Sequence, residues 1–272
     1  MGIFADKVVI ITGGASGIGR ALAEELSRRL ARLVLVDVNT KLLEEVTDSI
    51  TKTGGRAKAV TTDVSDFEMV KRLVGDTVAE YGRLDYIFNN AGTAVGGEAR
   101  DYSYDDWRRV IDVNLYGVVN GVAAAYPIMV KQGFGHIINT ASLAGLIPAV
   151  GEISYTASKY GVVGLSNALR VEGADLGVKV SVVCPGIIET PIFSTIKFVN
   201  CDREKMIRLM PKGIPPEKCA RLILCGVERN KATIVVTTLA KFFWLVQRIS
   251  PGLMLLIWRR GIRKMREARI GD

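Results

Sequence analysis

Short apolar segments rich in Val and Ile alternate with longer amphipathic segments along the chain. Near-continuous apolar strands separated by helices are typical of a parallel sheet that is covered on both faces. The alternation is unbroken, so it predicts one doubly wound α/β domain over residues 1–239, which includes the substrate site. The expected strands are 7–12, 32–37, 57–63, 84–90, 136–142, 178–184 and 232–236, and the expected helices are 17–30, 39–53, 66–81, 103–131, 154–176 and 215–229.

Composition and charge limit the classes of function. With 49% hydrophobic and 24% charged residues, the chain is expected to be globular. It has one histidine and four cysteines without a CxxC pair, so we expect reduced thiols and no metal site. The first residues lead almost at once into a strand and a glycine turn, unlike a signal peptide, so a cytoplasmic protein is expected.

The net charge of +8 is concentrated at the C-terminal end. From Ala240 onward, eight Lys/Arg residues stand against Glu267 and Asp272. The rest of the chain is nearly neutral, so the basic character belongs to the tail. We therefore expect no nucleic-acid partner.

A glycine-rich turn, TGGASGIGR, joins the first predicted strand to the first predicted helix. Glycines allow the backbone to turn tightly and to approach a pyrophosphate, and the helix N-terminus offers free N–H groups to that anion. A turn without a ligand is the alternative reading. The expected pyrophosphate-binding residues are Gly13, Ser16, Gly17, Ile18 and Gly19.

Asp37 supports the reading of a dinucleotide site. It ends the second predicted strand, 18 residues after Gly19, where its carboxylate can accept both ribose hydroxyls of an adenosine. The same carboxylate would repel a 2′-phosphate, and Val38 and Asn39 provide no arginine to bind one. The sequence therefore predicts NAD rather than NADP.

Two further strand ends could line the cofactor. Asp63 and Val64 end the third strand, where Asp63 could bind the adenine amino group or simply cap the strand. Asn90, Ala91 and Gly92 end the fourth strand, where small residues and amides fit a cofactor wall or an ordinary turn.

The stretch YTASK places Tyr155 and Lys159 one helical turn apart, on the same face of a predicted helix. The pair could be exposed, or it could be an acid/base tyrosine tuned by a lysine. A free tyrosine, with a pKa of about 10, is a poor base at neutral pH, and a nearby ammonium group lowers that pKa. Ser142, which ends the fifth strand, could hold a substrate oxygen near the phenol.

In their order and spacing, TGGASGIG, NNAG, Asn114, Ser142, Tyr155-x-x-x-Lys159 and Pro185-Gly186 resemble the short-chain dehydrogenase/reductase family over roughly residues 5 to 236. The resemblance is to the single-domain branch, and it implies a Rossmann-type fold and nicotinamide-dependent interconversion of an alcohol and a carbonyl compound. It also implies a homodimer or homotetramer formed through the helices at 103–131 and 154–176.

The same resemblance assigns roles to individual residues. Ser142, Tyr155, Lys159 and Asn114 would be catalytic. Lys159 would also hold the nicotinamide ribose, and Asn114 would hold a water for a proton relay, although an amide in mid-helix is unremarkable. The loop after the sixth strand would shape the nicotinamide pocket through Pro185, Gly186, Ile188 and Thr190.

Alternatives remain for the neighbouring residues. Ile188 could bind the carboxamide through its backbone, and Thr190 could bind it through its hydroxyl or cap a lid helix that starts at Pro191. Residues 187–214 are less regular and predict a mobile lid. His136 is expected to be structural.

The segment between Ser142 and Tyr155 should line the substrate pocket. Its residues Leu143, Ile147, Ala149 and Val150 predict an apolar wall, whereas Glu152 is expected to be a solvated loop carboxylate, although it could face substrate. The predicted substrate is an apolar secondary alcohol or ketone, such as a lipid, a steroid or a retinoid-like compound. The alternative is a catalytically idle, NAD-bound protein that docks on membranes through its tail.

The tail, residues 240–272, departs from the family pattern. Its apolar run from Phe242 to Trp258 is shorter than the roughly 20 residues of a spanning helix, and SPG at 250–252 interrupts it. We therefore expect two short pieces. The tryptophans and the cluster RRGIRK suit peripheral contact with a membrane, but packing on the core or on a second subunit is equally open.

Overall fold

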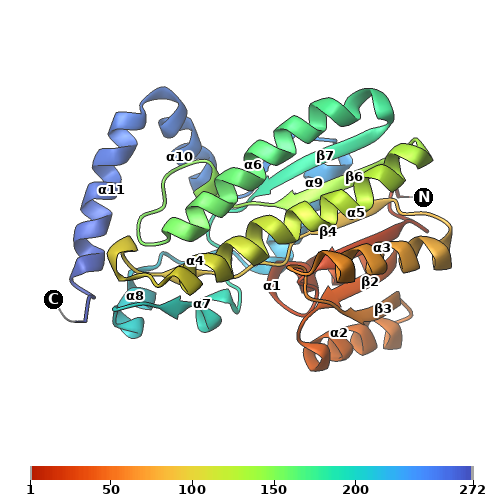
Figure 1. Cartoon of the computed structure of the whole chain (residues 1–272), viewed down its shortest axis with the longest axis horizontal. Coiled ribbons are helices and arrows are strands. Elements are labelled where there is room, and N and C mark those ends of the chain that lie inside the picture. The colour runs from red at the N-terminus through yellow and green to blue at the C-terminus, as the bar shows by residue number, and fades with distance from the viewer. Residues whose placement is uncertain (1, 271–272) are drawn as a thin grey trace.

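The computed structural model describes residues 2–270. A seven-stranded parallel sheet forms the centre of the protein (Figure 1). The strand order is β3-β2-β1-β4-β6-β7-β9, so the direction of winding reverses between β1 and β4. This confirms the predicted doubly wound fold. The strands are β1 (Val8–Thr12), β2 (Arg32–Asp37), β3 (Arg56–Thr61), β4 (Tyr86–Asn89), β6 (Gly135–Thr140), β7 (Val178–Cys184) and β9 (Thr233–Val235).

Helices cover both faces of this sheet. Alternate side chains of β1 point to opposite faces, so Val9 and Ile11 enter one core and Val8 and Ile10 enter the other. The first core is closed by α1 (Gly17–Arg28), α2 (Thr40–Lys52) and α9 (Pro216–Glu228), and the second by α3 (Phe67–Tyr81), α5 (Gly117–Gln132) and α6 (Ile153–Gly173).

The helix expected at 103–131 is interrupted by one π-helical turn. It consists of α4 (Tyr104–Ile111), the turn η2 (Asp112–Tyr116) and α5. The whole stretch is long and apolar enough to cross a membrane, but its residues Ala125 and Met129 are fully buried against the sheet, as in the core of a globular protein. The subunit interface expected on this helix and on α6 stays a prediction.

The irregular region 187–214 folds into short elements that the sequence pattern did not reveal. β8 (Lys197–Phe198) pairs with β5 (Val95–Gly96), and α7 (Ile192–Thr195) and α8 (Arg203–Leu209) flank β8. Strands of two residues are too short to show a period. Three short 3₁₀ turns complete the fold: η1 (Ala99–Asp101), η3 (Leu143–Gly145) and η4 (Ala174–Leu176).

The tail forms two helices, as the SPG break predicted. They are α10 (Thr238–Ile249) and α11 (Pro251–Arg266). Between them Ser250 caps α11 by accepting a hydrogen bond from the Leu253 N–H, and Pro251 occupies the first turn, where no N–H is needed. Figure 1 shows α11 standing at one end of the molecule, beyond α4 and α8.

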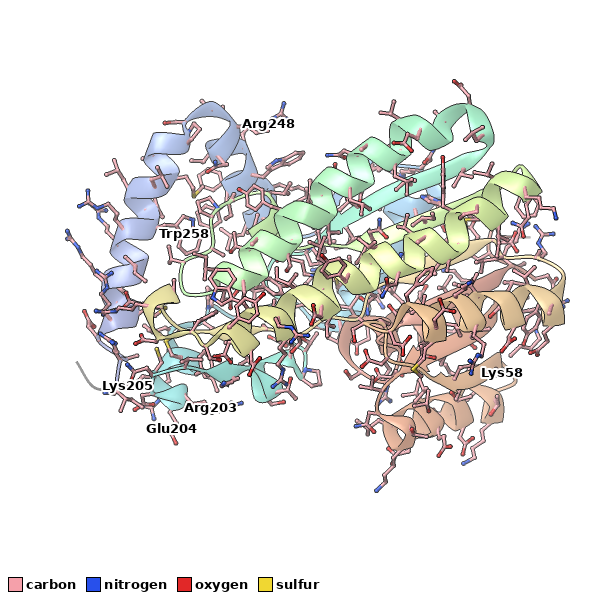
Figure 2. All side chains as sticks on the ribbon, viewed as in Figure 1. Lys58, Arg203, Glu204, Lys205, Arg248 and Trp258 are labelled. Atoms are coloured by element: carbon pink, nitrogen blue, oxygen red, sulfur yellow. The ribbon has the colours of Figure 1, made fainter. Side chains whose placement is uncertain are left out.

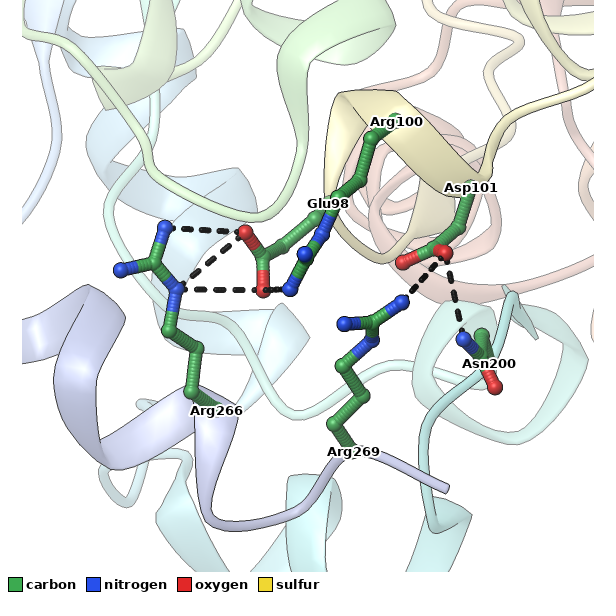
Figure 3. A network of polar contacts seen from close by, with 6 residues as sticks. All are labelled: Glu98, Arg100, Asp101, Asn200, Arg266 and Arg269. Carbon is green, nitrogen blue, oxygen red and sulfur yellow. Dashed lines mark hydrogen bonds and ion pairs between the residues drawn. The ribbon is translucent and has the colours of Figure 1, made fainter. Parts of the chain in front are cut away.

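The end of the tail packs on the body of the protein. Arg266 binds Glu98 at 3.0 Å, and Arg269 binds Asp101 at 2.9 Å, as Figure 3 shows. Both acids belong to the segment around η1. A small apolar cluster of Cys201, Met206, Met265 and Ala268 lies beside these ion pairs. Packing on the core, one of the open alternatives, therefore holds for this end of the tail.

The four cysteines are free, as expected, and Cys184 is buried in β7.

Candidate functional site

A cleft of about 1160 Å³ opens at the carboxyl ends of the strands, beside the point where the winding reverses between β1 and β4. Open α/β sheets bind ligands at this position. Of the predicted site residues, Gly19 and Asn114 lie behind the cleft wall. The others line it: Gly13, Ser16, Gly17, Ile18, Asp37, Asp63, Val64, Asn90, Ala91, Gly92, Ser142, Tyr155, Lys159, Pro185, Gly186, Ile188 and Thr190.

The glycine turn between β1 and α1 is crowded by backbone. A Cβ atom on Gly13 would lie 2.9 Å from Cα of Ala91, and one on Gly19 would lie 2.0 Å from the carbonyl oxygen of Gly13. Larger residues at either position would therefore push the turn apart. The turn lets the N–H groups at the start of α1 face the cleft, which suits a pyrophosphate.

Asp37 connects this turn to the next strand. Its Oδ2 accepts a hydrogen bond from the Ala15 N–H at 3.2 Å, and its Oδ1 accepts one from the Asn39 N–H at 3.0 Å. Each oxygen keeps a further lone pair toward the cleft, so the carboxylate can also accept ribose hydroxyls. Asp63 accepts from the N–H and the hydroxyl of Ser65, so it acts as a cap while it lines the cleft.

Thr12 fixes the ends of β1 and β4 to each other. Its hydroxyl oxygen accepts from the N–H of Asn90 at 2.9 Å and from the N–H of Ala91 at 3.0 Å. The Asn90 side chain donates back to the Thr12 carbonyl at 3.0 Å. These bonds join the two strand ends at the floor of the cleft, and the Asn90 Oδ1 also accepts from the Thr140 hydroxyl at 3.4 Å.

Tyr155 and Lys159 do not form an exposed pair. Both line the cleft from α6, and Lys159 is only 3% exposed. The Lys159 Nζ donates to the Thr140 carbonyl at 2.8 Å and lies 5.4 Å from the centre of the Tyr155 ring. Ser142 lies on the same wall, and its Oγ accepts from the Ala144 N–H at 3.1 Å. The three side chains predicted to act together therefore share one corner of the cleft.

Burial controls the acidity of this corner. It lowers the pKa of Lys159 to about 8, so the lysine remains mostly protonated at neutral pH. Burial also raises the pKa of Tyr155 above its usual value, the nearby Glu152 adds to the rise, and a hydrogen bond with Ser142 only partly offsets it. The lowered pKa of Tyr155 that was expected from the sequence is therefore not seen in the protein without its cofactor.

Asn114 lies in the π-helical turn and is fully buried. Its Oδ1 accepts from the Thr93 N–H at 2.8 Å, and its Nδ2 donates to the Thr93 carbonyl at 2.9 Å and to the Ser158 hydroxyl at 3.3 Å. The amide thereby joins the segment after β4 to α6, next to Lys159. In this structure its side chain holds protein groups in position.

The wall between Ser142 and Tyr155 is apolar, as predicted, because Leu143, Ile147, Ala149 and Val150 all line the cleft. Glu152 is half-buried and lines the cleft, which agrees with the alternative that it faces substrate rather than with a fully solvated carboxylate. Burial raises its pKa to about 7. A loop carboxylate looks solvated in sequence because the groups that cover it come from elsewhere in the chain.

The tail also forms part of the cleft wall, although sequence reasoning did not place it in the site. Phe243, Trp258 and Met265 line the cleft, and Figure 2 shows Trp258 on the inner side of α11. A Cβ atom on Gly151 would lie 2.1 Å from Sδ of Met265, so the loop before α6 touches the helix directly. The available signal was the spacing of Met254, Trp258 and Met265, which places them on one helical face.

The loop after β7 closes the remaining side. A Cβ atom on Gly17 would lie 3.1 Å from Cγ2 of Thr190, so this loop rests on the glycine turn. The expectation that Thr190 caps the lid helix is wrong, because α7 begins at Ile192 and Pro191 occupies the cap position. The residue before α10 packs against this loop as well, because a Cβ atom on Gly186 would lie 2.6 Å from the Thr237 hydroxyl.

His136 lies at the start of β6, so it is at the amino ends of the strands, whereas the cleft is at their carboxyl ends. Its Nε2 is 2.9 Å from the Ser181 hydroxyl, and burial lowers its pKa to about 3. This agrees with the expected structural role.

Comparisons with known proteins agree with the geometry of the site. The sequence profile of short chain dehydrogenases matches residues 7–198. SadH of Mycobacterium tuberculosis, named as an oxidoreductase, is 37% identical over 270 residues, which cover 97% of this chain and 98% of SadH. A cyclohexanol dehydrogenase of an Acinetobacter species is 37% identical over 225 residues, or 81% of this chain and 87% of that protein.

Among solved structures, a short chain dehydrogenase/reductase from Burkholderia phymatum in complex with NAD superposes with a TM-score of 0.85. The two sequences are 29% identical, and the match covers 93% of this chain and 96% of the other.

The buried Glu152 gives a prediction for stability. Because its pKa rises from 4.5 to about 7 on folding, the folded protein holds a proton that the unfolded chain releases between these values. The wild type should therefore lose stability as pH rises through this window, by on the order of 3 kcal/mol at most relative to Glu152→Gln. Urea unfolding at pH 5 and pH 8 measures the difference.

The matched control is Glu68→Gln, which changes an exposed carboxylate on α3. It should track the wild type at both pH values. A constant offset between wild type and Glu152→Gln across the window would contradict the burial of a titrating Glu152.

Proposed function

Since the chain belongs to the short chain dehydrogenase family of oxidoreductases, we propose that it interconverts an apolar secondary alcohol and its ketone with NAD as cofactor. The observation that carries the proposal is the corner of the cleft that Ser142, Tyr155 and a buried Lys159 line together. The cofactor, when bound, supplies the hydride acceptor or donor.

The residues of the chain move the proton. The Ser142 hydroxyl holds the substrate oxygen, and Tyr155 accepts its proton as the phenolate during oxidation or donates one as the phenol during reduction. A buried phenol with a raised pKa favours the neutral form, so a positive charge nearby is needed to stabilise the phenolate. Lys159 supplies one such charge, and its bond to Thr140 keeps it in place.

The fit of the cleft to NAD rests on the glycine turn and on Asp37. No side chain fits at Gly13 or Gly19 without displacing backbone, which leaves the turn open to a pyrophosphate. A 2′-phosphate on the bound ribose would lie near the Asp37 carboxylate, and the two negative charges would repel each other. A similar structure holds NAD, which agrees with this preference.

The substrate class follows from the far wall of the cleft. Ile147, Ala149, Phe243 and Met265 form an apolar surface there, which favours a hydrophobic substrate. A relative named for cyclohexanol supports the same class. The idle interaction protein, the alternative reading, is disfavoured because such a role needs neither the buried lysine nor its placement beside the phenol.

Tyr155→Phe tests the proton transfer. Removal of the hydroxyl should lower kcat by about 10²–10⁴-fold, since proton transfer by a positioned side chain contributes that factor. NADH binding, measured by fluorescence titration, should change little. Turnover is followed by NADH absorbance with cyclohexanol and larger alcohols.

Tyr160→Phe is the matched control, because Tyr160 lies on the same helix but faces solvent. It should keep wild-type turnover. Retained turnover in Tyr155→Phe, with both variants folded, would refute the assigned role.

Asp37→Asn tests the cofactor preference. The change keeps a hydrogen-bond acceptor near Ala15 but removes the negative charge. We expect the wild type to favour NADH over NADPH in kcat/KM, and the variant to reduce that ratio by about tenfold or more, which corresponds to about 1.4 kcal/mol. Equal efficiency with both cofactors in the wild type would contradict the interpretation of Asp37.

A further inference from the structure

The two tail helices expose a large apolar surface that the cleft does not use. Single exposed apolar residues are ordinary, but a contiguous group of them marks an interaction site. Seven large side chains between 37% and 75% exposed, none of which lines the cleft, lie within residues 242–257. They are Phe242, Leu245, Ile249, Leu253, Leu255, Leu256 and Ile257.

Apolar and basic residues are separated along the outer side of α11. Its first two turns present Leu253, Leu256 and Ile257, and its next two turns present Arg259, Arg260 and Arg263, all exposed. With a rise of 1.5 Å per residue, the arginines lie about 9–15 Å along the axis from Leu253. Interfacial helices bury their apolar faces about 5–10 Å deep, so these arginines would reach the depth of the phosphates.

The charges identify the occupant of this surface. From Thr238 to Arg266 the chain contains no acidic residue. Within the described residues, Arg259, Arg260 and Arg263 form no ion pair, whereas Arg266 is already bound to Glu98. In a symmetric dimer the same patch pairs with itself, and it contains no acidic residue that could pair with these arginines. An anionic lipid surface offers both an apolar interior and a compensating charge.

From this arrangement we propose that the α10–α11 turn inserts into the surface of a bilayer that carries anionic lipid. Figure 1 shows this turn at the end of the molecule away from the central strands, and Figure 2 shows Arg248 beside it. The other end of α11 is held by the ion pairs of Arg266 and Arg269. The helical hairpin formed by α10 and α11 would therefore dock together with the rest of the protein as one unit.

The same helices line the cleft on their inner side, through Phe243, Trp258 and Met265. A docked protein therefore has an apolar path from the lipid to the substrate wall. This second step depends on the proposed function, because it assumes an apolar alcohol or ketone as substrate. Docking itself does not depend on it.

Flotation of the full-length protein with vesicles tests the docking. The vesicles contain phosphatidylcholine alone or with phosphatidylserine. The wild type should float with the anionic vesicles and weakly with the neutral ones. Leu253→Ser/Leu256→Ser should lose binding to both, and Arg259→Gln/Arg260→Gln should bind the anionic vesicles on the order of 30-fold more weakly.

Two matched controls lie on α2, far from the tail. Leu42→Ser changes an exposed leucine, and Lys41→Gln/Lys52→Gln removes two exposed positive charges. Both controls should float like the wild type, and circular dichroism verifies that all variants are folded. A wild type that stays unbound, or hairpin variants that float like the controls, would overturn the proposal.

A second copy of the chain is the competing occupant, and light scattering detects it. If the Leu253→Ser/Leu256→Ser variant has a lower molecular mass in solution than the wild type, and the wild type does not float, the surface is a subunit interface and the proposal fails. None of these readouts requires turnover, so they remain valid if the proposed function is wrong.

Substrate transfer has its own readout. Leu253 and Leu256 do not line the cleft, so Leu253→Ser/Leu256→Ser should keep wild-type turnover of cyclohexanol in solution. It should turn over a long-chain secondary alcohol embedded in anionic vesicles at least tenfold more slowly than the wild type. Equal rates on the embedded alcohol would show that the bilayer contact does not deliver substrate.

Discussion

The buried ammonium group of Lys159 is the constraint on which the site depends. A buried cation is costly unless it is hydrogen-bonded, and here the Thr140 carbonyl at the end of β6 accepts from it at 2.8 Å. That bond fixes α6 against the sheet and thereby places Tyr155, one turn earlier, at the cleft. Asn114 reaches the same helix through Ser158. The lowered pKa of Lys159, about 8, reports the cost of this burial.

The cleft also depends on segments that meet only in the folded chain. The loop before α6 provides one wall and the tail provides the facing wall, and they touch where Gly151 meets Met265. Burial raises the pKa of Glu152 in that loop to about 7, and burial is also the largest cause of the raised pKa of Tyr155, to which the negative charge of Glu152 adds.

Local patterns predicted most of the fold and of the site from the sequence. Three features depend only on one strand end or one helical turn: the glycine turn, Asp37 and the Tyr155–Lys159 spacing. Their positions can therefore be predicted from the sequence without knowledge of the tertiary structure. The π-helical turn around Asn114 has no sequence period of its own. The position of Trp258 in the cleft depends on how the tail folds back, which no local pattern encodes.

The two sides of α11 obey different constraints. Met254, Trp258 and Met265 share its inner face: Met254 is fully buried, Trp258 and Met265 line the cleft, and Met265 also belongs to the small cluster beside it. The outer face touches no other part of the described chain closely, so nothing in the fold requires leucines there. Solvent alone would favour polar residues at those positions, because exposed apolar surface gains nothing in water. The proposed contact with anionic lipid would bury this apolar outer face, which the fold itself leaves exposed.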